Sequence, residues 1–215
     1  MDSDFLIRYL DTCRQVMNEN KDYLIRLDSV VGDGDLGLTM GDGFEAAYRR
    51  ASESRESDAG RILYQAGKAM AVAVPSTMGT LMASGWMQAG MQLKGKLSLE
   101  PEDIYTIFKA FEEGVAARGK AKVGDKTFLD GLDPAVKEME LSVRAGDPLD
   151  IMAQKAYRAA KRGFQDTTAM LAVHGRAAAR GEASRTLSDP GAAVAVLMMK
   201  SLEETIESDR KRTVV

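Results

Sequence analysis

The sequence predicts an all-α protein, an antiparallel up-and-down assembly of about eight amphipathic helices. Three observations predict this class. Apolar residues recur at helical spacing along the chain, convincing strand alternation is absent, and the loops between the periodic segments are short. Short connections favour antiparallel neighbours, so each helix is expected to run back along the previous one.

In chain order, the first expected helix covers 3–18, and a short helical turn follows within 18–27. Helical signals then return at 38–52, 58–73 and 78–92, and the loops after the second and third of these carry Pro75 and Gly95. The clearest helix begins at Pro101, which suits a first turn, and stops at Gly119. Its apolar residues recur at helical spacing, with charges between them: Ile104, Phe108, Phe111 and Val115.

Three further helices complete the chain. One is expected at 131–145, and one at 149–166 with Asp147 as N-cap and Pro148 at the first helical position. Asp189 and Pro190 repeat that signal before a buried Ala/Val/Leu/Met-rich helix at 192–206. The tail 209–215 is expected to fray, and no linker divides the chain, so residues 1–215 are predicted to form a single domain.

Composition excludes several classes of function. The net charge of -3, with both signs interspersed, predicts no nucleic-acid partner, and no apolar run is long enough to span a membrane. The N-terminus lacks a signal-peptide pattern, and the single cysteine, Cys13, fits a reducing cytoplasm. The only histidine, His174, has no obvious partner in the sequence, which argues against a catalytic triad or a histidine metal cluster.

The segment Leu27–Gly37 carries the most specific chemistry. It places Asp28, Asp33 and Asp35 in a loop with glycines at 32, 34 and 37, whose backbone can turn where a Cβ would interfere. Two carboxylates ~4 Å apart repel by roughly 4 kcal/mol at an effective dielectric near 20, so a folded loop needs a cation or full solvation. Mg²⁺ and Ca²⁺ prefer such oxygen ligands. The loop is therefore predicted to be a metal site.

Other interpretations of this loop are weaker. Its glycines match G-x-G-x-x-G, but aspartates at the variable positions would repel a bare pyrophosphate. An EF-hand counted from Asp33 places Phe44 where a bidentate Glu is required. A solvated acidic turn that caps the helix beginning near Gly37 is, for the Asp-Gly-Asp alone, an equal alternative.

Three more loops could hold an anion. Residues 74–80 place three hydroxyls before a helix, which suits an anion seat or an ordinary Ser/Thr cap. The loop 119–130 has three lysines without the order of a P-loop, and a solvated basic turn is its alternative. The segment 175–191 carries three arginines between glycines and could close over phosphate as a lid, or be a flexible surface loop.

Taken in order, the four loops resemble the nucleotide-binding (L) subunit or C-terminal domain of the dihydroxyacetone kinase family. The family carries L-D-x-x-x-G-D-G-D-x-G, a small Ser/Gly-rich turn, G-D-K-T-M-x-D and G-R-A-x-x-x-G-E-x-S-x-x-x-x-D-P-G-A. The matching segments are Leu27–Gly37, Ser76–Leu81, Gly124–Asp130 and Gly175–Ala192. Four ordered matches across almost the whole chain are far more specific than any one of them.

The resemblance implies a barrel of antiparallel amphipathic helices with ATP or ADP bound in loops at one end. It implies that Asp28, Asp33 and Asp35 hold two Mg²⁺ ions that bridge the phosphates, and that no other residue of this chain is catalytic. It assigns four groups of residues to the nucleotide. Leu36, Thr39 and Met40 follow the aspartates, and Thr77, Met78 and Gly79 form the small turn. Gly119, Thr127 and Phe128 would lie near the base and ribose, and Arg176, Asp189 and Pro190 on the lid side.

The chain also departs from the family pattern. Leu36 and Thr39 stand where the family usually has His and Asn, and Thr77-Met78-Gly79-Thr80 replaces Ser-Ser-Gly-Pro. The lid's usual Tyr-Leu is Ala179-Arg180. The metal triad is kept while the nucleotide-facing details differ, so the resemblance is to a divergent member, for which a different triose, tetrose or other ketose is a possible substrate.

The function that the resemblance implies is that of half an active site. A Mg²⁺-dependent kinase subunit would bind the nucleotide and phosphorylate a small hydroxyketone held by a separate substrate-binding subunit. The phosphate would come from ATP, or through bound ADP from a phosphotransferase-system protein. Two alternatives stay open: a nonenzymatic nucleotide-sensing or coactivator module, and a fatty-acid-kinase-like nucleotide domain.

Overall fold

The computed structural model describes residues 1–213, which form nine α-helices and two 3₁₀ segments. The α-helices are α1 (Asp4–Glu19), α2 (Lys21–Val31), α3 (Leu36–Ser52), α4 (Ala59–Ala73), α5 (Thr77–Gln92), α6 (Pro101–Gly119), α7 (Phe128–Ala145), α8 (Leu149–Asp166) and α9 (Pro190–Thr213). The 3₁₀ segments η1 (Thr167–Ala169) and η2 (Arg176–Ser184) lie between α8 and α9. The predicted all-α class is confirmed.

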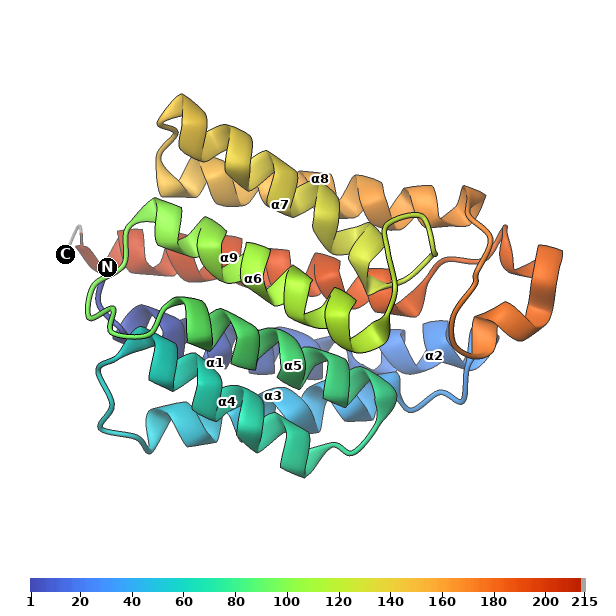
Figure 1. Ribbon diagram of the computed structural model, residues 1–215, viewed down its shortest axis with the longest axis horizontal. Helices are drawn as coiled ribbons and strands as arrows, with labels where there is room; N and C mark the ends of the chain where they lie inside the picture. The colour runs from blue at the N-terminus through green and yellow to red at the C-terminus, as the bar shows by residue number, and fades with distance from the viewer. Residues whose placement is uncertain (214–215) are drawn as a thin grey trace.

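The helices close into a ring around one core. From α3 to α9 each helix packs on the next in sequence, α1 packs on α3, and α9 returns to α1. Figure 1 shows the long helices running side by side along the molecule, with both termini at one end. The loops after α2, α4 and α6 and the 3₁₀ segments meet at the opposite end. No helix in the described part of the chain is long and apolar enough to cross a membrane.

An aromatic cluster fills the centre of the ring. Trp86 of α5 is fully buried, and its ring packs edge-on against Phe111 of α6 at 4.7 Å and Tyr9 of α1 at 6.0 Å between centroids. Phe44 of α3 completes the contact at 6.5 Å. These rings come from four helices, so the amphipathic faces read from the sequence converge on one core.

The helix starts at the prolines differ in how well they were predicted. Pro101 is the first residue of α6 and Asp189 caps α9 by accepting the Ala192 N–H through Oδ2, both as expected; a capping box of Glu100 and Asp103 also holds the start of α6. Asp147 was expected to cap α8, and this is wrong. Pro148 is the N-cap residue, and the Asp147 carboxylate instead pairs with Lys155 Nζ at 2.6 Å.

Three boundaries also differ from the prediction. The short turn expected within 18–27 is the eleven-residue helix α2, and α7 begins at Phe128 rather than 131. Helix α9 continues to Thr213, so 209–213 is helical where fraying was expected. Ion pairs fasten this end, since Asp209 pairs with Arg8 and Arg210 with Asp150. Residues 214 and 215 lie outside the described residues.

A candidate metal and nucleotide cleft

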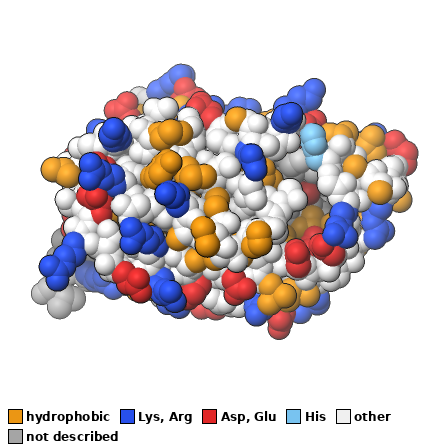
Figure 2. All heavy atoms as spheres, turned by 60° about the horizontal axis from the view of Figure 1, so that its bottom comes forward, with side chains coloured by type: hydrophobic (Ala, Val, Ile, Leu, Met, Phe, Trp, Pro, Cys, Tyr) orange, Lys and Arg blue, Asp and Glu red, His pale blue; other side chains and the backbone are white. Residues whose placement is uncertain are grey.

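A cleft of about 500 Å³ opens at the loop end of the ring. It is lined by four segments far apart in sequence: the α2–α3 loop, the start of α5, residues 174–177 and the start of α9. Figure 2 shows a recess toward the right of the view, with acidic side chains below it and the histidine above it. The closed ring brings these loops together because every second connection lies at the same end.

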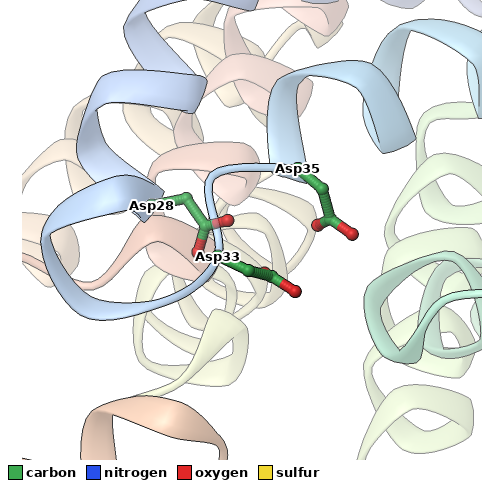
Figure 3. A group of neighbouring side chains, drawn as sticks. All are labelled: Asp28, Asp33 and Asp35. Carbon is green, nitrogen blue, oxygen red and sulfur yellow. The ribbon is translucent and has the colours of Figure 1, made fainter.

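Three carboxylates form the acidic wall of this cleft. Asp28 lies in the last turn of α2, Asp33 in the following loop, and Asp35 directly before α3. Each offers an oxygen within 4.8 Å of the others, and Figure 3 shows the three side chains on the same side of the loop. Three hard oxygen donors at this spacing, two of them solvent-exposed, fit a divalent cation such as Mg²⁺.

The alternative of an ordinary helix cap does not account for these carboxylates. Asp35 occupies the N-cap position of α3, yet its side chain makes no capping hydrogen bond. The Leu36 N–H donates instead to Asp28 Oδ2, at 3.3 Å. Burial and the charges of Asp33 and Asp28 raise the pKa of Asp35, which Arg176 opposes. Asp35 lines the cleft, and its carboxylate is repelled by those of Asp28 and Asp33, a repulsion that a bound cation would relieve.

The glycines of this loop serve two different purposes. Gly34 has φ +76, a conformation that a side chain disfavours. Gly37 is helical, but a Cβ there would lie 2.2 Å from the carbonyl oxygen of Lys21. The expectation that all three glycines serve unusual turns therefore holds at Gly34, whereas Gly37 lets α3 approach the start of α2 closely. That approach brings Asp28 beside the first turn of α3.

The N-terminus of α5 faces the acidic loop across the cleft. Ser76 is the N-cap and accepts the Gly79 N–H through Oγ at 3.0 Å, so the ordinary cap does exist. Thr77 and Met78 also line the cleft, and their N–H groups precede the first intrahelical bonds. A helix start with free amides and a positive dipole end is suited to phosphate. The Ser76 cap uses the Gly79 N–H, so the Thr77 and Met78 amides are still available to an anion.

The segment between α8 and α9, residues 167–189, covers the third side and is called the lid below. Its Arg176 Nη2 lies 2.6 Å from Asp33 Oδ2, which joins the lid to the acidic loop. His174 also lines the cleft, and its Nε2 lies 3.0 Å from Asp125 Oδ2. The sequence offered no obvious partner for His174, and the structure supplies one in Asp125. Its partner lies 49 residues away, which no local pattern could indicate.

Asp189 and Pro190 join the lid to the start of α9 and line the cleft. The Asp189 side chain caps α9 through the Ala192 N–H at 2.7 Å, and its own N–H donates to Thr167 Oγ1 at 3.1 Å. Burial and the charge of Asp130 raise the pKa of Asp189 to about 7, while the Ala192 N–H and Lys126 oppose that shift. Asp189 therefore caps α9 and also lines the cleft.

The predicted nucleotide residues divide into two groups. Those that line the cleft are Leu36, Thr77, Met78, Arg176, Asp189 and Pro190. The others do not line it: Thr39 and Met40 are buried in α3, Gly79 is in the first turn of α5, Gly119 ends α6, and Thr127 and Phe128 begin α7. Phe128 packs on Phe111, and Thr127 caps α7 through the Leu129 N–H.

Comparison with known proteins agrees with this geometry. The DAK2 domain family model matches residues 30–204. The chain is 31% identical to the PEP-dependent dihydroxyacetone kinase, ADP-binding subunit DhaL of Escherichia coli K12, over 92% of this chain and 94% of that protein. It is 32% identical to L-erythrulose 1-kinase of Mycolicibacterium smegmatis, over 93% of this chain but 35% of that protein.

The fold also has solved counterparts. The dihydroxyacetone kinase of C. freundii superposes with TM-scores of 0.71 in its native form and 0.69 in complex with AMP-PNP and Mg²⁺. The identities are 22% and 20%, and the match covers 93% of this chain and 34% of that longer chain. The family model, the full-length relative and the shared fold lead to one conclusion: this chain belongs to the DAK2 domain family, as a member of the dihydroxyacetone kinase L-subunit family.

Proposed function

We propose that this protein is the Mg²⁺- and nucleotide-binding subunit of a dihydroxyacetone-type kinase, acting in the cytoplasm with a separate substrate-binding subunit. The observation that carries the proposal is the cleft itself, in which three carboxylates face the free amides of a helix start. A cation site opposite an anion seat is the arrangement that a metal–nucleotide complex requires. The E. coli relative is named for ADP binding.

Each wall of the cleft has a role in this proposal. Asp28, Asp33 and Asp35 would hold Mg²⁺, two ions in all, and the metal would supply neutralisation of phosphate charge. The Thr77 and Met78 amides would donate hydrogen bonds to phosphate oxygens, and Arg176 could exchange its ion pair with Asp33 for one with a phosphate. Phosphoryl transfer depends mainly on such positioning, so this chain needs no general base of its own.

The remaining predicted residues are proposed to form the base and ribose side. Thr127 and Phe128 begin α7 next to the α9 start that lines the cleft, and Gly119 ends α6 beside Leu81 of α5. Leu36, Thr39, Met40 and Gly79 belong to the first turns of the two helices that flank the cleft. We propose that these turns shape the nucleotide pocket.

The phosphate source is proposed to be a phosphotransferase-system protein, with ADP kept as a bound cofactor. This rests on the PEP-dependent E. coli relative, which the match covers over 94% of its length. Direct transfer from ATP is the alternative, and the ketose would in both cases be held by the partner subunit. The two sources differ in whether ADP leaves the protein after each turnover.

The first test is calorimetric titration of ADP and ATP into the purified protein, with and without Mg²⁺, for the wild type and Asp33→Asn. Asp22→Asn, a charge loss on the exposed part of α2, is the matched control. We expect binding that requires Mg²⁺ and that is lost in Asp33→Asn alone. Absence of binding to the wild type would refute the proposed function.

A second test separates an enzyme subunit from a binding module. A ketose-binding subunit is added together with dihydroxyacetone or erythrulose, and either ATP or PEP with the phosphotransferase proteins is supplied. Ketose phosphate formed only from PEP supports the proposed route, and product from ATP supports direct transfer. Nucleotide binding with no turnover under either condition would favour the coactivator alternative.

A further inference from the structure

Lys126 is a buried charged side chain beneath the lid. It is 2% exposed and has φ +61, a conformation uncommon outside glycine. Its ammonium nitrogen contacts five main-chain carbonyl oxygens, those of Thr167 at 2.5 Å, Met170 at 3.3 Å, Ser184 at 2.7 Å, Arg185 at 3.2 Å and Leu187 at 2.5 Å. An ammonium has three protons, so these five oxygens share them.

The five carbonyls come from both ends of the lid. Thr167 and Met170 lie where the chain leaves α8, and Ser184, Arg185 and Leu187 lie where it approaches α9. No ion pair of Lys126 is found within the described residues, so carbonyl dipoles replace the usual carboxylate. A buried lysine is costly unless its charge is met in this way. Lys126 therefore closes the base of the lid.

The residue before Lys126 holds the middle of the same lid. The Asp125 carboxylate faces His174 at 3.0 Å, and the Asp125 carbonyl accepts the Val173 N–H at 3.3 Å. The turn that carries both residues is itself anchored on α7, because Asp130 accepts the Gly124 N–H at 2.6 Å and the Thr127 N–H at 2.7 Å. The lid is thus fastened to the rigid start of α7.

We propose that Lys126 is a positioning residue that fixes the lid over the cleft, so that Arg176 and His174 face the three aspartates. The inference deepens the proposed function and rests on it for the nucleotide's part. Without the ammonium, five carbonyl oxygens lose their common donor. Within the described residues, the two ends of the lid are then joined by only three weaker contacts: Asp189 N–H to Thr167 Oγ1, Ala172 N–H to Ser184 Oγ, and Arg185 to the Ala169 carbonyl. Arg176 would then lose its fixed place opposite Asp33.

Hydrogen exchange of the free protein tests the fastening without any nucleotide. Lys126→Met keeps the length of the side chain and removes the charge, and Lys122→Met removes an exposed lysine from the same loop. We expect exchange in residues 168–188 to accelerate at least about tenfold in Lys126→Met, the factor that corresponds to about 1.4 kcal/mol, and to stay unchanged in Lys122→Met. Unchanged exchange in both variants would overturn the proposal.

A chemical rescue separates the ammonium from simple packing. In Lys126→Ala, n-propylammonium can replace the missing atoms from Cγ to Nζ, whereas n-propanol has the same size and one hydroxyl proton. We expect the ammonium alone to restore slow exchange in the lid. Rescue by both compounds, or by neither, contradicts the proposed role. If the variants do not fold, the same comparison is made on recovery of the folded state by circular dichroism.

Nucleotide affinity distinguishes this inference from the proposed function. We expect Lys126→Met to loosen the lid and to weaken Mg²⁺–ADP binding at least about tenfold. A loosened lid with unchanged affinity would overturn the positioning role. If wild-type protein binds no ADP while Lys126→Met still loosens the lid, the proposed function fails and the fastening of the lid by Lys126 stands.

Discussion

Neutralising Asp35 should stabilise the metal-free protein while abolishing its response to Mg²⁺. The carboxylate oxygens of Asp28, Asp33 and Asp35 lie within 4.8 Å of one another. At that separation two charges repel by about 3.5 kcal/mol at an effective dielectric of 20 and by about 0.9 kcal/mol in water. Asp33 and Asp35 are exposed, so the smaller figure applies to each pair.

The net effect of Asp35→Asn follows from the charges that remain. The substitution removes two repulsions, from Asp28 and Asp33, and one attraction, from Arg176. About 1 kcal/mol of stabilisation is left, which corresponds to a rise of about 2–4 °C in Tm for a domain of this size. Loss of one carboxylate ligand should at the same time remove most of the stabilisation that Mg²⁺ adds by binding the folded state.

The assay is thermal unfolding at low salt, in EDTA and over a Mg²⁺ titration, for the wild type, Asp35→Asn and the Asp22→Asn control. The wild type should start lower than Asp35→Asn in EDTA and overtake it as Mg²⁺ is added. Asp22→Asn should follow the wild type in its response to Mg²⁺. A lower Tm for Asp35→Asn in EDTA, or an undiminished response to Mg²⁺, would refute the reasoning.

Three further predictions concern the walls of the cleft. The folded-state pKa of Asp189, about 7, exceeds its unfolded value, so its contribution to stability decreases by up to about 4 kcal/mol as pH rises from about 4 to 7. In urea unfolding across that range, the free energy of unfolding of Asp189→Asn should therefore depend less on pH than that of the wild type. Gly37→Ala should lower the free energy of unfolding by about 1–3 kcal/mol, because its Cβ would meet the Lys21 carbonyl, and equal urea midpoints for variant and wild type would contradict this. Arg176→Met should strengthen binding of Mg²⁺ alone by up to about fivefold, because its partly exposed ion pair no longer competes for Asp33, and should weaken binding of the Mg²⁺–ADP complex. Calorimetry that finds both dissociation constants unchanged would exclude the role given to Arg176.

Most helices were predictable because their signals are local. Pro101 with its capping box and Asp189 with Pro190 act within one turn, and the expected starts were found there. Asp147 failed as a cap because its carboxylate pairs instead with Lys155, which lies nearly two turns into the following helix. Helix α2 was underestimated because it is short and buries only two residues, Leu24 and Val31.

The candidate site was predictable only in part. Asp28, Asp33 and Asp35 could be grouped from sequence, because all three lie within an eight-residue span whose glycines let the loop turn. His174 and Lys126 were missed as participants. Their partners lie 49 residues away for His174, and 41 to 61 residues away for Lys126, beyond the reach of any local pattern.

The sequence by itself thus determined the all-α class, the order of the helices and the loop that gathers the three aspartates, since each depends on interactions within a few residues. Only the tertiary structure decided that α9 returns to α1, and that the lid lies over the aspartates. Those arrangements depend on how separate apolar faces share one core, and on a buried ammonium that finds its carbonyl partners only after the chain has closed around it.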